Sequence, residues 1–109
     1  MATISARAFH ERNKDSTSFE MVTVDATVGG KALTGGTFGS AHYAMITVET
    51  APIRFTTDGT APTSTVGHLL SPNDSIELDS PEDLTAFRAI RTGSTSAAIA
   101  CTYQSMKTS

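Results

Sequence analysis

Residues 43–59 read YAMITVETAPIRFTTDG, and apolar and polar residues alternate in both halves of this stretch. Ile46 and Val48 share one side of the first half, and Ile53 and Phe55 share one side of the second. A period of two is the pattern of a strand with one buried face. The stretch therefore predicts two β-strands, separated at the proline, that each turn one apolar face toward a core.

Turn-forming residues divide the rest of the chain into short segments. The pairs Gly29-Gly30 and Gly35-Gly36 suit positive φ angles, and Asp58-Gly59 is a common turn sequence. We expect further strands at residues 19–28, 31–34, 66–70, 75–78, 85–90 and 96–105, a turn at residues 71–74 and one helical turn from Pro81. About seven or eight short strands at this spacing predict an all-β fold, namely a small antiparallel β-sandwich of jelly-roll or immunoglobulin-like size.

The composition favours one domain with a modest core. The chain has 109 residues, 39% of them hydrophobic, and no tryptophan. Such a core relies on aliphatic side chains, which favours further stabilisation by a partner subunit. The formal net charge is -3 and the basic residues are scattered, so we expect neither nucleic acid nor a membrane as a partner.

The first residues differ in composition from the rest. Residues 1–17 are polar, with Ile4 and Phe9 as their apolar anchors. They are either a frayed terminus or an extended N-terminal arm that becomes ordered on a neighbouring subunit, and the sequence favours neither. We divide the chain into this arm and a β-sandwich domain, residues 18–109. The N-terminal sequence lacks the apolar core of a signal peptide, so we expect a protein that is made in a cytoplasm and is not exported.

Residue types that carry enzyme and metal chemistry show no recognisable motif. Cys101 lies in the apolar run AAIACTY, which predicts a buried thiol without an internal disulfide. His10, His42 and His68 lack the spacing of a metal site. Five acids in residues 73–83 favour a solvated face, with a calcium site as the alternative. We expect no catalytic residue, no cofactor and no metal, and therefore not an enzyme.

Arg54 and Asp58 invite two interpretations. An even separation places both on one side of a strand, about 13 Å apart in ideal geometry. The favoured interpretation makes Arg54 a surface or interface residue and Asp58 a turn former. The alternative is that both line a polar ligand site. His68 is expected to have a structural role.

A longer pattern covers residues 44–104. It begins with a strand that ends in V-E, followed by I-R-F-x-x-D-G-x-x-P-T and then by G-H-x-L. A turn with Asp, a strand with F-R-x-I and a closing strand that ends in T-Y complete it. Its positions are Val48-Glu49, Ile53-Arg54-Phe55, Asp58-Gly59, Pro62-Thr63, Gly67-His68, Leu70, Asp74, Phe87-Arg88, Ile90 and Thr102-Tyr103. This order resembles small structural proteins of tailed bacteriophage virions, of the capsid decoration (cement) or the collar and tail accessory type.

The resemblance implies a β-sandwich that forms a homo-oligomer, expected to be a trimer, and has no catalytic activity. The function it implies first is capsid decoration, in which the oligomer binds the capsid surface, contacts the major capsid protein and stabilises the head. A collar or tail accessory protein is the alternative within the same class. Either protein is assembled in the host cytoplasm, and a decoration protein ends on the capsid surface of the virion.

The arm and the loops are the expected sites of contact between subunits. The candidate interface residues are Ala6, Arg7, Phe9, His10, Arg12, Lys14, Arg54, Asp58, Thr60, Thr63, Asn73 and Asp74. A function of another class stays open, because the string TDGTAPT also resembles carbohydrate-binding β-sandwich modules that act in glycan binding or host attachment. Such modules stack sugars on Trp or Tyr, and this chain has no Trp and two Tyr, so capsid decoration is favoured.

Overall fold

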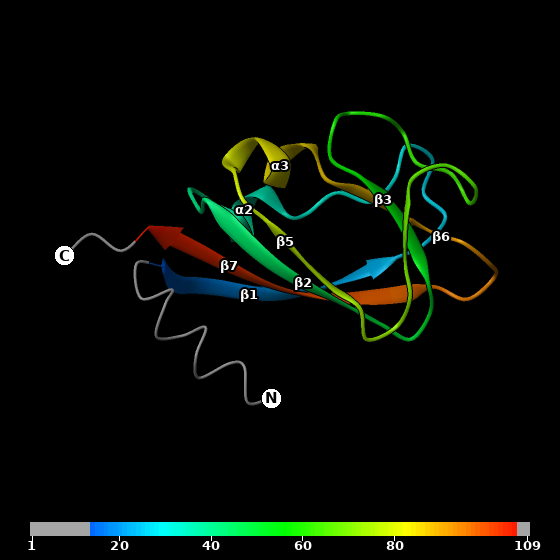
Figure 1. Ribbon diagram of the computed structural model, residues 1–109, viewed down its shortest axis with the longest axis horizontal. Helices are drawn as coiled ribbons and strands as arrows, with labels where there is room; N and C mark the ends of the chain where they lie inside the picture. The colour runs from blue at the N-terminus through cyan, green and yellow to red at the C-terminus, as the bar shows by residue number, and fades with distance from the viewer. Residues whose placement is uncertain (1–13, 107–109) are drawn as a thin grey trace.

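The computed structural model describes residues 14–106, which form two antiparallel sheets (Figure 1). The elements are β1 (Lys14–Val24), α2 (Gly35–Phe38), β2 (Tyr43–Glu49), β3 (Ile53–Thr56), β4 (His68–Leu70), β5 (Ser75–Leu78), α3 (Pro81–Ala86), β6 (Arg88–Arg91) and β7 (Ala97–Met106). One sheet has four strands in the order β1-β7-β2-β5, and the other has three in the order β4-β3-β6. These seven strands confirm the expected all-β fold and antiparallel β-sandwich.

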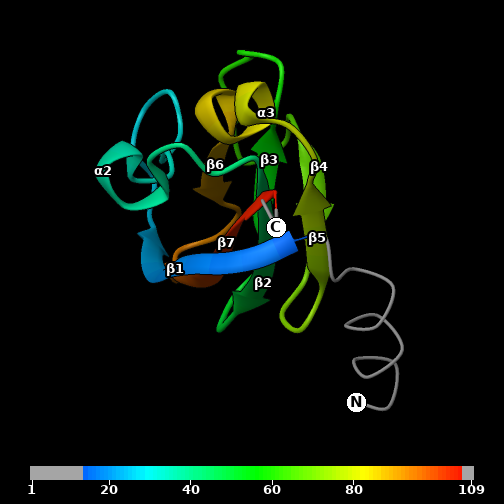
Figure 2. The same cartoon turned by 90° about the vertical axis from the view of Figure 1, so that its left-hand side faces the viewer.

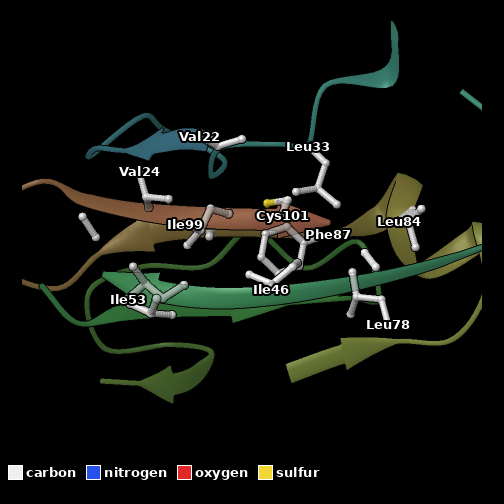
Figure 3. Packing of buried hydrophobic residues seen from close by; sticks show 14 of the residues in the cluster. Val22, Val24, Leu33, Ile46, Ile53, Leu78, Leu84, Phe87, Ile99 and Cys101 are labelled. Carbon is white, nitrogen blue, oxygen red and sulfur yellow. The ribbon is translucent and has the colours of Figure 1, made fainter. Parts of the chain in front are cut away.

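Alternation along the strands determines which side chains form the core. On β2, Ala44, Ile46 and Val48 are buried while their neighbours are not, as the period of two predicts. On the adjacent strand β7, Ile99 and Cys101 lie opposite Val48 and Ile46 and join the same buried cluster. Figure 3 shows Ile46, Ile99 and Cys101 close together. Each fully buried aliphatic side chain contributes roughly 1.5–3 kcal/mol.

The helical turn expected from Pro81 is confirmed as α3. Ser80 is its N-cap, and its Oγ accepts a hydrogen bond from the backbone N–H of Asp83 at 3.1 Å. Pro81 occupies the first turn, where its missing N–H is not needed. Leu84 is the buried residue of α3 and packs in the hydrophobic core. The strand expected at residues 85–90 is partly wrong, because this capped helix includes residues 85–86 and β6 begins at Arg88.

The segment around Lys31 departs from the expected strand. Only Lys31 pairs, in a single bridge to Ala89, with Lys31 N–H donating to the Ala89 carbonyl at 2.6 Å. The expected turn at Gly35-Gly36 is also wrong, because the Phe38 N–H bonds to the Thr34 carbonyl at 3.0 Å and closes a helical turn instead. Two adjacent glycines permit either conformation, so the sequence alone does not decide between them.

Three strand ends also differ from expectation. The strand expected at residues 19–28 ends at Val24, because Asp25 Oδ1 accepts the backbone N–H of Thr27 at 3.0 Å and turns the chain. β4 begins at His68 rather than at residue 66, because Gly67 has a φ of 127° and interrupts the extended backbone. A side chain at Gly67 would place its Cβ 3.0 Å from the carbonyl oxygen of Phe55, so glycine suits this close approach. β1 begins at Lys14, so residues 14–17, which we assigned to the arm, belong to the strand, with a register shift between Ser16 and Ser18.

Candidate interaction surfaces

A hollow of about 390 Å³ lies between the end of β3 and the start of β4. Its lining consists mainly of hydroxyl-bearing residues, one carboxylate and one imidazole: Thr56, Thr57, Asp58, Thr60, Val66, Gly67 and His68. The antiparallel pairing of Phe55 with His68 is what brings these residues of two strands together. The hollow can accept hydrogen bonds at its carboxylate and donate or accept them at its hydroxyls.

Asp58 forms the turn in the hollow, as expected. Its Oδ1 accepts a hydrogen bond from the backbone N–H of Thr60 at 3.0 Å, and Gly59 follows with a φ of 91°. This backbone hydrogen bond, followed by the Thr60 side chain, lowers the pKa of Asp58 from its ordinary value. Asp58 is therefore an exposed carboxylate that stays ionised at neutral pH.

Arg54 is not among the residues that line this hollow. Its Nη1 donates to the carbonyl of Gly67 at 3.0 Å, and its Nε is buried without a hydrogen-bond partner among residues 14–106. The guanidinium therefore ties β3 to the segment before β4. His68 packs its ring on Phe55, with centroids 5.3 Å apart. A structural role accounts for both side chains.

The turn at residues 71–74 lies at the other end of β4. Asp74 Oδ2 accepts from the Ser71 N–H at 2.8 Å, and Asn73 adopts a φ of 78°. The Asn73 N–H donates to the Val48 carbonyl at 2.7 Å, which docks the turn against the end of β2. The expected turn is confirmed. The two loops proposed as interface sites are thus separated by the length of β4 and form no common patch.

A second hollow, of about 310 Å³, lies between the β2–β3 and β6–β7 loops. Its lining is uncharged and again rich in hydroxyl groups: Thr50, Ala51, Pro52, Thr92, Gly93, Ser94 and Thr95. Thr50 has a φ of 81°, a left-handed conformation that is uncommon for a β-branched residue. The sequence does not indicate this hollow, because the two loops meet only through the pairing of β3 with β6, which sets Ile53 opposite Arg91.

The surface of the four-stranded sheet that faces away from the core is uncharged over the middle of β1, β7 and β2, and Glu49 lies at its end, opposite Ala98. We call it the outer face and define it by the side chains of Phe19, Met21, Thr23, Met45, Thr47, Ala98, Ala100 and Thr102. Register places Phe19, Thr102 and Met45 in one row across β1, β7 and β2. Phe19 is 58% exposed and Met21 49%. The alternation of residues 19–24 indicated apolar side chains on both sides of this strand but not which side is buried.

The buried polar residues of the same sheet point the other way. Tyr103 donates its hydroxyl hydrogen to Glu20 Oε2, and its ring lies 5.7 Å from that of Phe38 on α2. Burial raises the pKa of Tyr103, and the Glu20 hydrogen bond raises it further. Burial likewise raises the pKa of the Cys101 thiol to about 12. Cys101 is the expected buried, protonated thiol and not a nucleophile at neutral pH.

The remaining candidate interface residues divide into two groups. Ala6, Arg7, Phe9, His10 and Arg12 lie outside residues 14–106, and Lys14 is the first residue of β1. Thr60 and Thr63 lie on the loop beside the first hollow, where Thr63 Oγ1 accepts from the Val66 N–H at 3.0 Å.

Residues 14–106 bring no three His, Cys, Asp or Glu side chains together as a set of metal ligands. No helix in this range has both the length and the apolarity to cross a membrane.

Comparison with known proteins gives no family. No protein-family model matches the chain, and no curated protein matches it. Among solved structures, the chain is similar to the solution NMR structure of a de novo designed double-stranded beta-helix. That similarity has 13% sequence identity and a TM-score of 0.41, over 83% of this chain and 91% of the other. It is too weak to bear on function.

Proposed function

We propose that this chain is a structural protein of a tailed bacteriophage virion, acting as a capsid decoration protein that forms a homo-oligomer on the head and stabilises it. The proposal rests on the pattern in residues 44–104 that resembles phage structural proteins, and on where its residues lie in the fold. Ile53 and Phe87 are fully buried, Asp58-Gly59 and Asp74 form turns, and Tyr103 ties two strands together. The motif residues thus support the sandwich at several separate places, as core side chains, turns and a link between strands.

The two separated loops suit a protein that braces a shell. The loop at residues 57–67 and the turn at residues 71–74 lie at opposite ends of β4, and Figure 1 shows them apart. A copy seated on the capsid can then contact one major capsid subunit at each end. Hydroxyl-rich loops make many hydrogen bonds without burying charge, and a lattice of copies multiplies weak contacts.

The test mixes the full chain with capsids that lack it and separates bound from free chain by sedimentation. We expect saturable binding and an increase in the temperature at which the capsids disrupt. Binding to isolated tails or collars in place of heads would support the accessory alternative. Binding to no virion part would contradict the proposal.

A second candidate function, glycan binding, is favoured by the first hollow. The TDGTAPT string forms much of its wall, and Asp58 offers a carboxylate to sugar hydroxyls beside the hydroxyls of Thr57 and Thr60. A glycan array probed with the full chain tests it. A saturable signal that Asp58→Asn removes would support this function, and a signal unchanged by Asp58→Asn would contradict the assignment to this hollow.

A further inference from the structure

The outer face is uncharged at its centre and acidic at one margin. Register places Phe19, Thr102 and Met45 in one row, and Glu77 of β5 ends that row. Glu49 of β2 lies two rows further along. Both glutamates are exposed, and we call them the acidic margin. A segment that covers this face must therefore offer apolar side chains to the centre and positive charge to the margin.

Both helices pack on the other side of this sheet. Phe38 of α2 packs on the inward-facing ring of Tyr103, and Leu84 of α3 joins the buried cluster. The helices lie on one side of the β1–β7 layer in Figure 1, and Figure 2 shows them above β1. They therefore leave Phe19 and Met21 exposed on the outer face.

Residues 1–13, which we call the N-terminal segment, differ in charge from the rest of the chain. They hold two arginines and one glutamate, a formal charge of +1, whereas residues 14–109 hold six basic and ten acidic residues, a formal charge of −4. Phe9 lies between Arg7 and Arg12. The N-terminal segment thus combines an apolar side chain with positive charge, which is the complement of the outer face and its acidic margin.

We propose that the N-terminal segment docks on the outer face of its own chain, with Phe9 against Phe19 and Met45 and its arginines toward the acidic margin. The inference does not depend on the virion function. A second copy fits this face less well, because two sheets packed face to face would bring each acidic margin over the other margin or over an apolar centre. Both arrangements are unfavourable.

The length of the N-terminal segment allows this docking. It joins the sheet at Lys14, whose backbone pairs with Met106 at one end of β1 and β7. Phe9 lies five residues before Lys14 and Phe19 five residues after it, so each is separated from Lys14 by about 17 Å of extended chain. A reversal of the chain before β1 can therefore bring the two rings together.

The tether also favours the chain's own segment over that of another copy. Residues 1–9 span up to about 30 Å, and the four strands of the sheet are about 14 Å across. A short tether gives an effective concentration in the millimolar range, which exceeds that of a second chain in dilute solution. Docking within one chain therefore does not require the area of a stable interface between two chains.

The first test is disulfide formation between an engineered cysteine in the N-terminal segment and one in a sheet. Ala8→Cys is combined with Met21→Cys, and the matched control combines Ala8→Cys with Leu69→Cys on the other sheet. Met21 and Leu69 are 49% and 52% exposed, and the natural Cys101 is buried. We expect the first pair to join within one chain about tenfold faster than the control pair, at a rate independent of protein concentration.

Two outcomes of this experiment would overturn the inference. Equal rates for the two pairs would mean that the N-terminal segment does not prefer the outer face. A disulfide that joins two chains, at a rate that rises with protein concentration, would assign the face to the segment of a neighbouring copy.

Oxidative labelling of Met21 in the full chain tests the apolar contact without engineered cysteines. We expect Phe9→Ser to increase the rate of Met21 oxidation severalfold, because the segment then loses its apolar anchor. Val28 is 98% exposed, so Val28→Ser is the control and should leave the rate unchanged. Circular dichroism confirms that each variant is folded. An unchanged rate in Phe9→Ser would overturn the inference.

Charge exchange tests the contact with the acidic margin. Arg7→Glu together with Arg12→Glu should also increase the rate of Met21 oxidation. Adding Glu49→Lys and Glu77→Lys should lower that rate again, because the charges of the two surfaces are then exchanged. A rate that the first pair leaves unchanged, or that the added pair fails to lower, would overturn the inference. These measurements contain no capsids, so their outcome and that of capsid binding are distinguishable.

Discussion

The hydroxyl of Tyr103 donates a hydrogen bond to the carboxylate of Glu20, and this contact joins β7 to β1 inside the sandwich. The same carboxylate oxygen accepts the backbone N–H of Thr34 at 3.1 Å, just before α2. Glu20 therefore links three segments that are distant in sequence. The link fixes the inner side of β1 and leaves Phe19 and Met21 on the outer side.

Removing the hydroxyl should weaken this link. We expect Tyr103→Phe to lower the free energy of unfolding by about 1–2 kcal/mol, because a buried hydrogen bond to a charged group is lost. Glu20→Ala should cost more, since it leaves the buried Tyr103 hydroxyl without its acceptor. Urea denaturation of the two variants measures both. Equal stability of Tyr103→Phe and the unmodified chain would show that the hydrogen bond contributes nothing.

Stability should fall in alkaline solution. The folded chain holds the Cys101 proton up to a pKa of about 12, against an ordinary value of 9.0. Above pH 9 the unfolded chain loses this proton more readily than the folded chain does. The contribution of the Cys101 thiol to stability is therefore full below pH 9 and is lost as the pH rises toward 12. Tyr103 acts in the same direction above its ordinary value of 10.0.

Two variants separate these contributions. Thermal unfolding is measured between pH 8 and pH 11, a range set by these titrations. The melting temperature should fall less steeply with pH for Cys101→Ala than for the unmodified chain. Tyr103→Phe should reduce the decline only at the upper end of the range. A flat profile for the unmodified chain would contradict the burial of both groups.

The core should be sensitive to truncation. Ile46 and Phe87 are fully buried, and we expect Ile46→Ala or Phe87→Ala to cost roughly 2–5 kcal/mol, because each leaves a cavity. Val28 is 98% exposed, so Val28→Ala should change stability very little. Chemical denaturation of the three variants provides the comparison, and a loss for Val28→Ala as large as for Ile46→Ala would count against the core as described.

Two glycines offer a matched pair. Gly30 and Gly59 have φ angles of 88° and 91°, so alanine at either position meets the same backbone strain of about 1–2 kcal/mol. A Cβ added at Gly30 would also lie 2.8 Å from the Cβ of Arg88. A Cβ added at Gly59 would meet no heavy atom of residues 14–106 within 4 Å. Gly30→Ala should therefore lower the melting temperature more than Gly59→Ala. Equal losses would mean that the contact relaxes without cost.

Strand alternation and turn chemistry were sufficient to predict most of the sandwich. Residues 75–78 form the expected strand, and Asp58 and Asp74 make the expected turns. The helix α2 could not be predicted, because Gly35-Gly36 suits a turn equally well. The first hollow depends on the register that sets Phe55 opposite His68, and register between distant strands is not visible in local sequence.

The most direct test of the proposed function is the number of copies bound per capsid at saturation. Capsids lacking this chain are titrated with it, and bound copies are counted from the sedimented fraction. For a decoration protein we expect a plateau at a fixed ratio to the major capsid protein. Absence of binding, or binding that rises with concentration and reaches no plateau, would contradict that function.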